Sequence, residues 1–142
     1  MEEGILAEFH KSLINFIDEL IETFPTEPDL VLLRIFLKDK IPIKKIMDFF
    51  NQKIYVLKDR ISARDETIFQ EYNFFMMFDS SQLNPAYQNI LNIFSKDKIP
   101  HFKTMWRMLD EYNKETTWKW IDSFVYLARK YQQAIQNKNE NF

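Results

Sequence analysis

Apolar side chains recur at three- and four-residue spacing along most of this 142-residue chain. The clearest stripe spans 5–24 and predicts an amphipathic helix. Pro25 should end that helix, because the residue before a proline avoids the helical region. Further stripes over 43–61 and 114–136 predict two more long helices. The run 30–37 is apolar nearly all round, which indicates a short buried helix.

The middle of the chain is less regular. Residues 64–72 fit a helix, but the five apolar residues at 74–78 follow one another and cannot all face one side. A chain of this length fits one domain. The pattern therefore predicts an all-α fold: a single-domain, irregular or orthogonal bundle of about six helices over 1–136, with a polar tail at 137–142.

The segment KDKIP occurs twice, at 38–42 and 96–100. In both copies an apolar run ends in lysines, which suit the negative end of a helix macrodipole. A proline follows, which suits the first turn of the next helix. We interpret the repeat as a turn between two helices, used twice. A duplicated helical hairpin, a duplicated ligand loop and chance recurrence in a chain rich in Lys and Ile are the open alternatives.

Composition limits the chemistry. Gly4 is the only glycine, and phosphate loops, dinucleotide turns and nucleophile elbows all need glycines, so these sites are excluded. The chain has no cysteine, which suits a reducing, cytoplasmic compartment. His10 and His101 have no metal-ligand spacing. No apolar stretch is long enough for a membrane span. We expect no catalytic residue, cofactor, metal or membrane contact.

Charge is unevenly distributed. Residues 1–33 carry eight acids and one base, and residues 34–60 carry eight bases and three acids. A basic strip can contact phosphates, so nucleic-acid association is the alternative function. In the simpler interpretation, the acidic first helix packs near the basic third one. The candidate phosphate contacts are Lys44, Lys45, Lys53, Lys58 and Arg60, supported by Lys96, Lys98 and Lys103.

Adjacent acids recur along the chain, and the pair Asp65 and Glu66 begins a segment just after Arg64. Neighbouring residues on a helix point about 100° apart, so such a pair does not converge on one substrate. A role at a helix start is expected for these acids. An enzyme with a carboxylate site at this pair is the third hypothesis, and the chain is predicted not to be an enzyme.

Aromatic residues are abundant, with fourteen Phe, six Tyr and three Trp. Met and Phe together form adaptable contact surfaces, and Trp is enriched at interface hot spots. These features predict a non-enzymatic protein–protein interaction module, an adaptor or minor structural or assembly protein, with self-association as one mode. Burial in the core is the alternative for the same side chains. The candidate partner interface is Phe74, Phe75, Met76, Met77, Phe78, Trp118 and Trp120.

Three stretches carry a resemblance: NFIDELIETFP, RDETIFQEYN and HFKTMWRMLDEYNKETTWKWIDSFVYLARKYQ. In this order they resemble uncharacterised short helical proteins of large nucleocytoplasmic DNA viruses. Such proteins often end in a Trp-Lys-Trp-like helix, which Trp118 to Trp120 match. The resemblance covers about half of the chain and rests on packing patterns. It implies a viral protein in the host cytoplasm or the virion, and it transfers no functional residue.

Overall fold

The computed structural model describes residues 1–71 and 104–140, and it confirms the all-α class, since no strand occurs in this part of the chain. Residues 74–78 and the second KDKIP copy lie outside the described residues. Residues 104–108 are helical. The remaining elements, in chain order, are α1 (Glu2–Thr23), α2 (Pro28–Ile35), the π-helical turn η1 (Phe36–Lys40), α3 (Ile43–Lys53), the 3₁₀ turn η2 (Tyr55–Leu57), α4 (Lys58–Ser62), α5 (Ile68–Glu71) and α7 (Glu111–Glu140).

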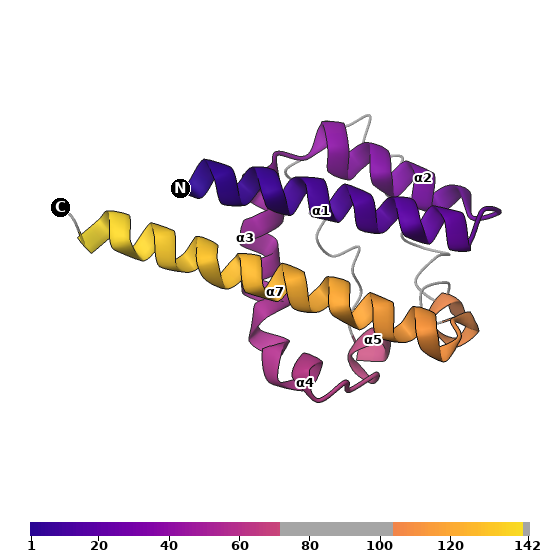
Figure 1. Ribbon diagram of the computed structural model, residues 1–142. Helices are drawn as coiled ribbons and strands as arrows, with labels where there is room; N and C mark the ends of the chain where they lie inside the picture. The colour runs from indigo at the N-terminus through magenta and orange to yellow at the C-terminus, as the bar shows by residue number, and fades with distance from the viewer. Residues whose placement is uncertain (72–103, 141–142) are drawn as a thin grey trace.

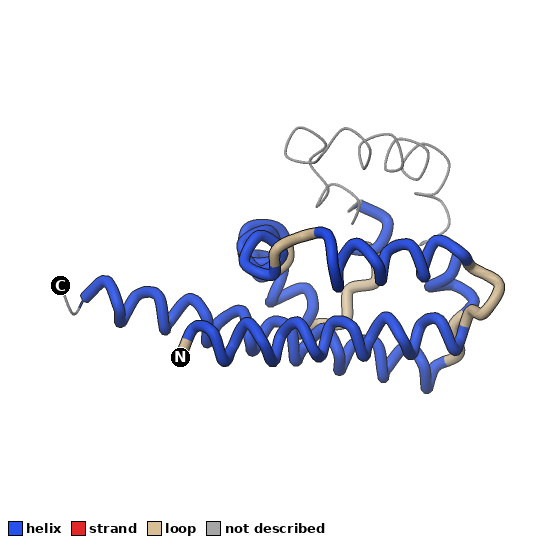
Figure 2. Tube along the Cα trace, turned by 90° about the horizontal axis from the view of Figure 1, so that it is seen from above, coloured by secondary structure: helices blue, strands red, loops and turns tan. Residues whose placement is uncertain are grey.

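Helices α1 and α7 lie side by side and run in opposite directions (Figure 1). Near the start of α1, Glu2 Oε1 lies 3.9 Å from Lys138 Nζ at the end of α7. Near the other end, Trp120 Nε1 donates a hydrogen bond to Glu19 Oε2 at 2.6 Å. Figure 2 shows both helices along one side of the molecule, at the bottom of the view, with α2 and α3 on the opposite side, above them in this view. We call this pair the α1–α7 layer.

Phe124 of α7 lies at the centre of the core. Its ring centroid is 5.7 Å from those of Phe9 and Phe16 on α1, and 6.1 Å from that of Phe50 on α3. Phe9 and Phe50 also contact each other, at 5.5 Å. All of these rings meet edge to face, the arrangement that aromatic quadrupoles favour. The core therefore joins α1, α3 and α7.

The first KDKIP copy joins two helices, as predicted. Element η1 ends at Lys40, Ile41 is extended, with φ −110° and ψ 124°, and α3 begins at Ile43. Lys38 lies with Lys40 in the last turn of η1, where unpaired carbonyl groups favour cations. Pro42 precedes α3 as its N-cap instead of lying in its first turn, a small correction to the prediction.

The stripe over 43–61 is not one helix, which corrects the prediction. Helix α3 ends one residue before Ile54, and η2 and α4 follow. Leu57 N donates to Ile54 O at 2.8 Å, a three-residue step that tightens the turn. The change of direction buries Ile54, Leu57 and Ile61, while Val56 faces solvent. The sequence pattern missed the break because buried apolar residues continue through it.

Helix α1 ends at Thr23, so Pro25 stops it where predicted. Helix α7 is longer at both ends than the predicted 114–136. At its start, Asp110 Oδ1 accepts a hydrogen bond from Asn113 N at 2.7 Å, which satisfies one of the free N–H groups of the first turn. At its end, α7 continues to Glu140, into the segment expected to be a polar tail.

Candidate interaction surface

Trp118 is a core residue, which corrects its assignment to the candidate interface. Its side chain is only 3% exposed. The ring lies 5.2 Å from Phe69 and 5.4 Å from Trp106, and the Arg64 guanidinium lies 5.5 Å from it. The chain from α4 to α5 folds over this edge of α7, and helical spacing alone cannot show which edge of a helix another segment covers.

Trp120 is partly buried where α1 and α7 meet. Its ring lies 5.9 Å from Phe16 and 6.1 Å from Phe124. Its indole N–H donates to Glu19, which is exposed. Trp120 therefore has an apolar body in the core and a polar edge at the surface of the α1–α7 layer. The other candidate interface residues, 74–78, lie outside the described residues.

Arg64 adopts a left-handed backbone conformation, with φ 57°. It follows α4, and Arg64 N donates to Ile61 O while Asp65 N donates to Arg60 O, each at 3.0 Å. These two bonds define a Schellman motif, in which glycine usually takes the left-handed position. The strain of an arginine there must be offset by contacts of its side chain.

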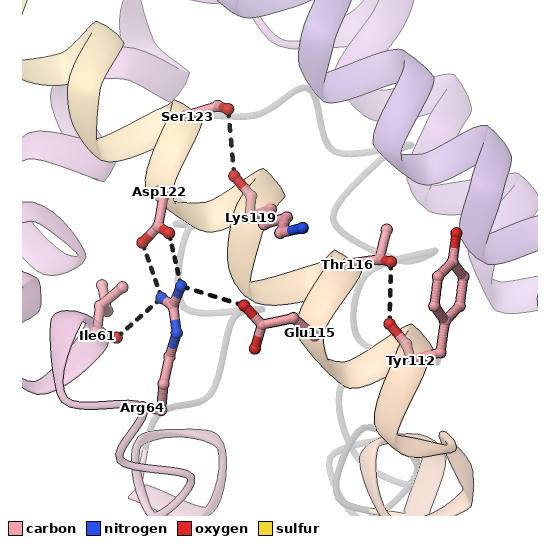
Figure 3. Close-up of polar contacts among 8 residues, drawn as sticks. All are labelled: Ile61, Arg64, Tyr112, Glu115, Thr116, Lys119, Asp122 and Ser123. Carbon is pink, nitrogen blue, oxygen red and sulfur yellow. Dashed lines mark hydrogen bonds and ion pairs between the residues drawn. The ribbon is translucent and has the colours of Figure 1, made fainter.

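The Arg64 side chain supplies those contacts by reaching α7 (Figure 3). Nη1 and Nη2 donate to the two carboxylate oxygens of Asp122 at 2.9 and 2.8 Å, and Nη2 lies 3.6 Å from Glu115 Oε1. Nη1 also donates to Ile61 O at 3.2 Å. The hydrogen bonds to Asp122 raise the pKa of Arg64. This residue therefore fixes the end of α4 against α7.

Asp65 and Glu66 point to different cations. Asp65 Oδ1 accepts hydrogen bonds from Thr67 Oγ1 at 2.5 Å and Thr67 N at 3.1 Å, and Asp65 Oδ2 accepts one from Arg60 Nε at 2.8 Å. The Thr67 hydroxyl, and then Arg60, lower the pKa of Asp65 to about 2. Glu66 lies 3.6 Å from Lys114 of α7. Asp65 shapes the turn before α5, which begins only at Ile68, so neither acid lies in the first turn of a helix, and the helix expected over 64–72 is described only at Ile68–Glu71.

The candidate phosphate contacts do not share one environment. Lys44, Lys45 and Lys53 are exposed on α3. Lys58 Nζ lies 4.7 Å from the centre of the Tyr55 ring, and Arg60 is held by Asp65. The supporting lysines at 96, 98 and 103 lie outside the described residues.

The acidic α1 packs against the basic α3, as the simpler interpretation predicted, but no ion pair joins these two helices among the described residues. They pack through Phe9 and Phe50. An ion pair joins α1 to the basic segment through α2, where Arg34 Nε lies 2.6 Å from Asp18 Oδ1. Most acids of α1 and the lysines of α3 remain at the surface.

The outer face of α7 carries aromatic and basic side chains that sequence analysis did not select. Tyr126 is 50% exposed, and its ring lies 5.2 Å from Lys130 Nζ and 5.7 Å from the Arg129 guanidinium. Tyr112 is 78% exposed and projects from the first turn (Figure 3). Lys119 is exposed between the two tyrosines. Within the described part of the chain, Lys119, Arg129 and Lys130 have no acidic partner.

The signal for this face is present in the sequence. Lys119, Tyr126, Lys130 and Gln133 recur at the spacing of one helix face, opposite the apolar stripe of α7. Trp118 lies at the edge of the apolar stripe, where aromatic residues beyond the needs of the core were expected, whereas Tyr126 lies on the polar side of the helix.

Two kinds of site do not occur in the part of the chain that the structure describes. Residues 1–71 and 104–140 contain no group of three or more His, Cys, Asp or Glu side chains that could hold a metal ion. No helix in these ranges combines the length and the apolar character needed to cross a membrane.

Comparison of the sequence with protein-family models, with curated proteins and with solved structures gives no match. The resemblance to viral helical proteins therefore stays a prediction from the three stretches that carry it.

Proposed function

We propose that this chain is a non-enzymatic protein–protein interaction module, an adaptor or a minor structural component, and that the outer face of α7 is its contact surface. The observation that carries the proposal is Tyr126, half exposed between Arg129 and Lys130. Tyrosine and arginine are enriched at interface hot spots, because a rigid ring buries much area at a low entropic cost. The virion or the infected-cell cytoplasm, implied by the resemblance, is the setting that belongs to this proposal.

The position of this face on α7 supports the proposal further. The core side of α7 is occupied by α1 and α3 through Phe124, so the outer face is open to another molecule. The two acids near this face, Glu115 and Asp122, are engaged by Arg64. This leaves the cations beside Tyr126 to attract an acidic partner surface.

Site-specific photo-cross-linking tests the proposal. A photoreactive phenylalanine analogue replaces Tyr126 or Tyr112 in the cell that naturally makes the chain, and Val56, which is 66% exposed on η2, is the matched control position. We expect protein adducts from the two α7 positions and few from position 56. Equal adduct yields from all three positions, or no adducts from α7, would contradict an interaction surface there.

Nucleic-acid association through 34–60 is the second candidate, favoured by the exposed Lys44, Lys45 and Lys53 on α3. Phosphate contacts of this kind release counterions, so binding should weaken steeply with salt. Fluorescence anisotropy with labelled single-stranded RNA and DNA measures this. A K44E/K45E variant should then lose most of the binding, while K11E on α1 should keep it. The absence of binding by the wild type at low salt would remove this candidate.

A further inference from the structure

The outer surface of the α1–α7 layer carries opposite charges on its two helices. On α1, Glu8 and Glu22 are exposed on the outer face, with Lys11 and Asn15 between them. On α7, Lys119 and Lys130 are exposed, and their spacing of eleven residues places them on one face of the helix, opposite its apolar stripe. Within the described residues, none of these four charged side chains has an ion-pair partner. The layer therefore presents an acidic ridge beside a basic ridge.

The register between the two helices aligns these charges. The hydrogen bond from Trp120 to Glu19 shows that these two residues lie at the same level along the axes of the two antiparallel helices. Lys130 lies ten residues beyond Trp120, and Glu8 lies eleven residues before Glu19, so both are roughly 15 Å from that level at 1.5 Å per residue. Lys119 and Glu22 lie within about 5 Å of it. The ion pair between Lys138 and Glu2 fixes the same alignment at the far end.

We propose that this surface binds a second copy of the chain through a twofold axis parallel to α1 and α7. Such a rotation places α1 of each copy over α7 of the other. It leaves the position of every residue along the helix axes unchanged. Glu8 then faces Lys130 of the second copy, and Glu22 faces its Lys119, and each pair occurs twice. A twofold contact requires a self-complementary surface of this kind.

Tyr126 lies near the middle of the same surface. It is level with the part of α1 between Lys11 and Asn15, and it supplies the apolar contact that exposed charges alone lack. Lys11 is the one base on the outer face of α1, at the level of Arg129, and it opposes the contact. The expected dimer is weak and salt-sensitive, because its ion pairs lie at an exposed interface.

This inference rests on the proposed function, since it names the partner as the chain itself, and a charge swap tests it. One variant, E8K/E22K, makes both ridges basic, and the other, K119E/K130E, makes both acidic. All four positions are exposed, and circular dichroism verifies that the variants fold. Sedimentation velocity, over a range of concentrations and at low and high salt, measures association.

We expect the wild type to dimerise with increasing concentration and each variant alone to associate at least roughly tenfold more weakly. An equimolar mixture of the two variants should restore dimerisation, because both contacts of the mixed dimer then join opposite charges. K11E should tighten the wild-type dimer, because it removes the one opposing base.

Three results would overturn the inference: a wild type that stays monomeric, variants that associate like the wild type, or a mixture that shows no restoration. The cross-linking experiment separates this failure from failure of the proposed function. Adducts at Tyr126 with a different protein would leave the interaction module standing without self-association. The absence of any adduct would remove both.

Discussion

At the scale of single residues, Arg64 is the most informative position. It takes the left-handed conformation that glycine usually supplies at a helix end, in a chain whose only glycine is Gly4. Its guanidinium joins Asp122 and Glu115 of α7 and lies against Trp118. The strained backbone and the side-chain contacts occur at one residue, so substitutions can separate the two.

Comparison of R64A with R64G separates them. Both variants lose the contacts to α7, but alanine keeps the left-handed strain that glycine relieves. We expect R64A to lower the free energy of unfolding by about 2 kcal/mol and R64G by about 1 kcal/mol less than that. Urea denaturation measures both values. Equal stability of the two variants would show that the backbone strain is not significant.

The lowered pKa of Asp65 predicts that the stability of the fold depends on pH. Its pKa is lowered to about 2 by Thr67 and Arg60, below the value near 4 of an unfolded chain, so the folded state binds fewer protons in that range. Its stabilising contribution is present above about pH 4 and is lost as the pH falls towards 2.

D65N should therefore make the free energy of unfolding fall less steeply between pH 4 and 2 than it does in the wild type. Denaturation curves across this range, at constant ionic strength, measure the slope. D39N is the control and should keep the wild-type slope, because the Asp39 carboxylate is exposed and has no side-chain hydrogen bond or ion pair in the described part of the chain. A D65N slope equal to that of the wild type would contradict the assigned role.

At the scale of elements, α7 has two different sides. One side packs Phe124 and Trp118 into the core, and the other presents Tyr126 with its cations. Sequence analysis identified the helix and its apolar stripe, because helical spacing is a local property. It could not identify which edge of α7 is buried, because the residue that packs over Trp118 at this edge is Phe69, which is far away in the sequence.

Alanine substitutions on the two sides of α7 should therefore have different effects. W118A should lower the free energy of unfolding by about 3–5 kcal/mol, because it opens a cavity beside Phe69 and Trp106. Y126A should cost less than about 1 kcal/mol, since only exposed cation–π contacts are lost. Thermal and urea denaturation at low protein concentration measure both. A large loss of stability in Y126A would mean that this residue is structural.

At the scale of the whole molecule, the aromatic side chains that form the core and the charged side chains at the surface are distributed differently over the helices. The aromatic core joins α1, α3 and α7, while most acids of α1 and the lysines of α3 and α7 remain at the surface. The uneven charge seen in the sequence is therefore not neutralised by packing α1 on α3. The acidic surface that it leaves on α1 is one half of the proposed contact between two copies, and Lys119 and Lys130 of α7 supply the other half.

The sequence by itself determined the helical class, the end of α1 before Pro25 and the turn at the first KDKIP copy. These features depend on backbone sterics and helix spacing, which neighbouring residues set. Only the tertiary structure decided the break at Ile54, the burial of Trp118 and the bond from Arg64 to Asp122. Each of these features depends on contacts between segments far apart in the chain. The free energy gained by burying one edge of a helix, or by pairing a charge, depends on which segment packs against that edge or charge.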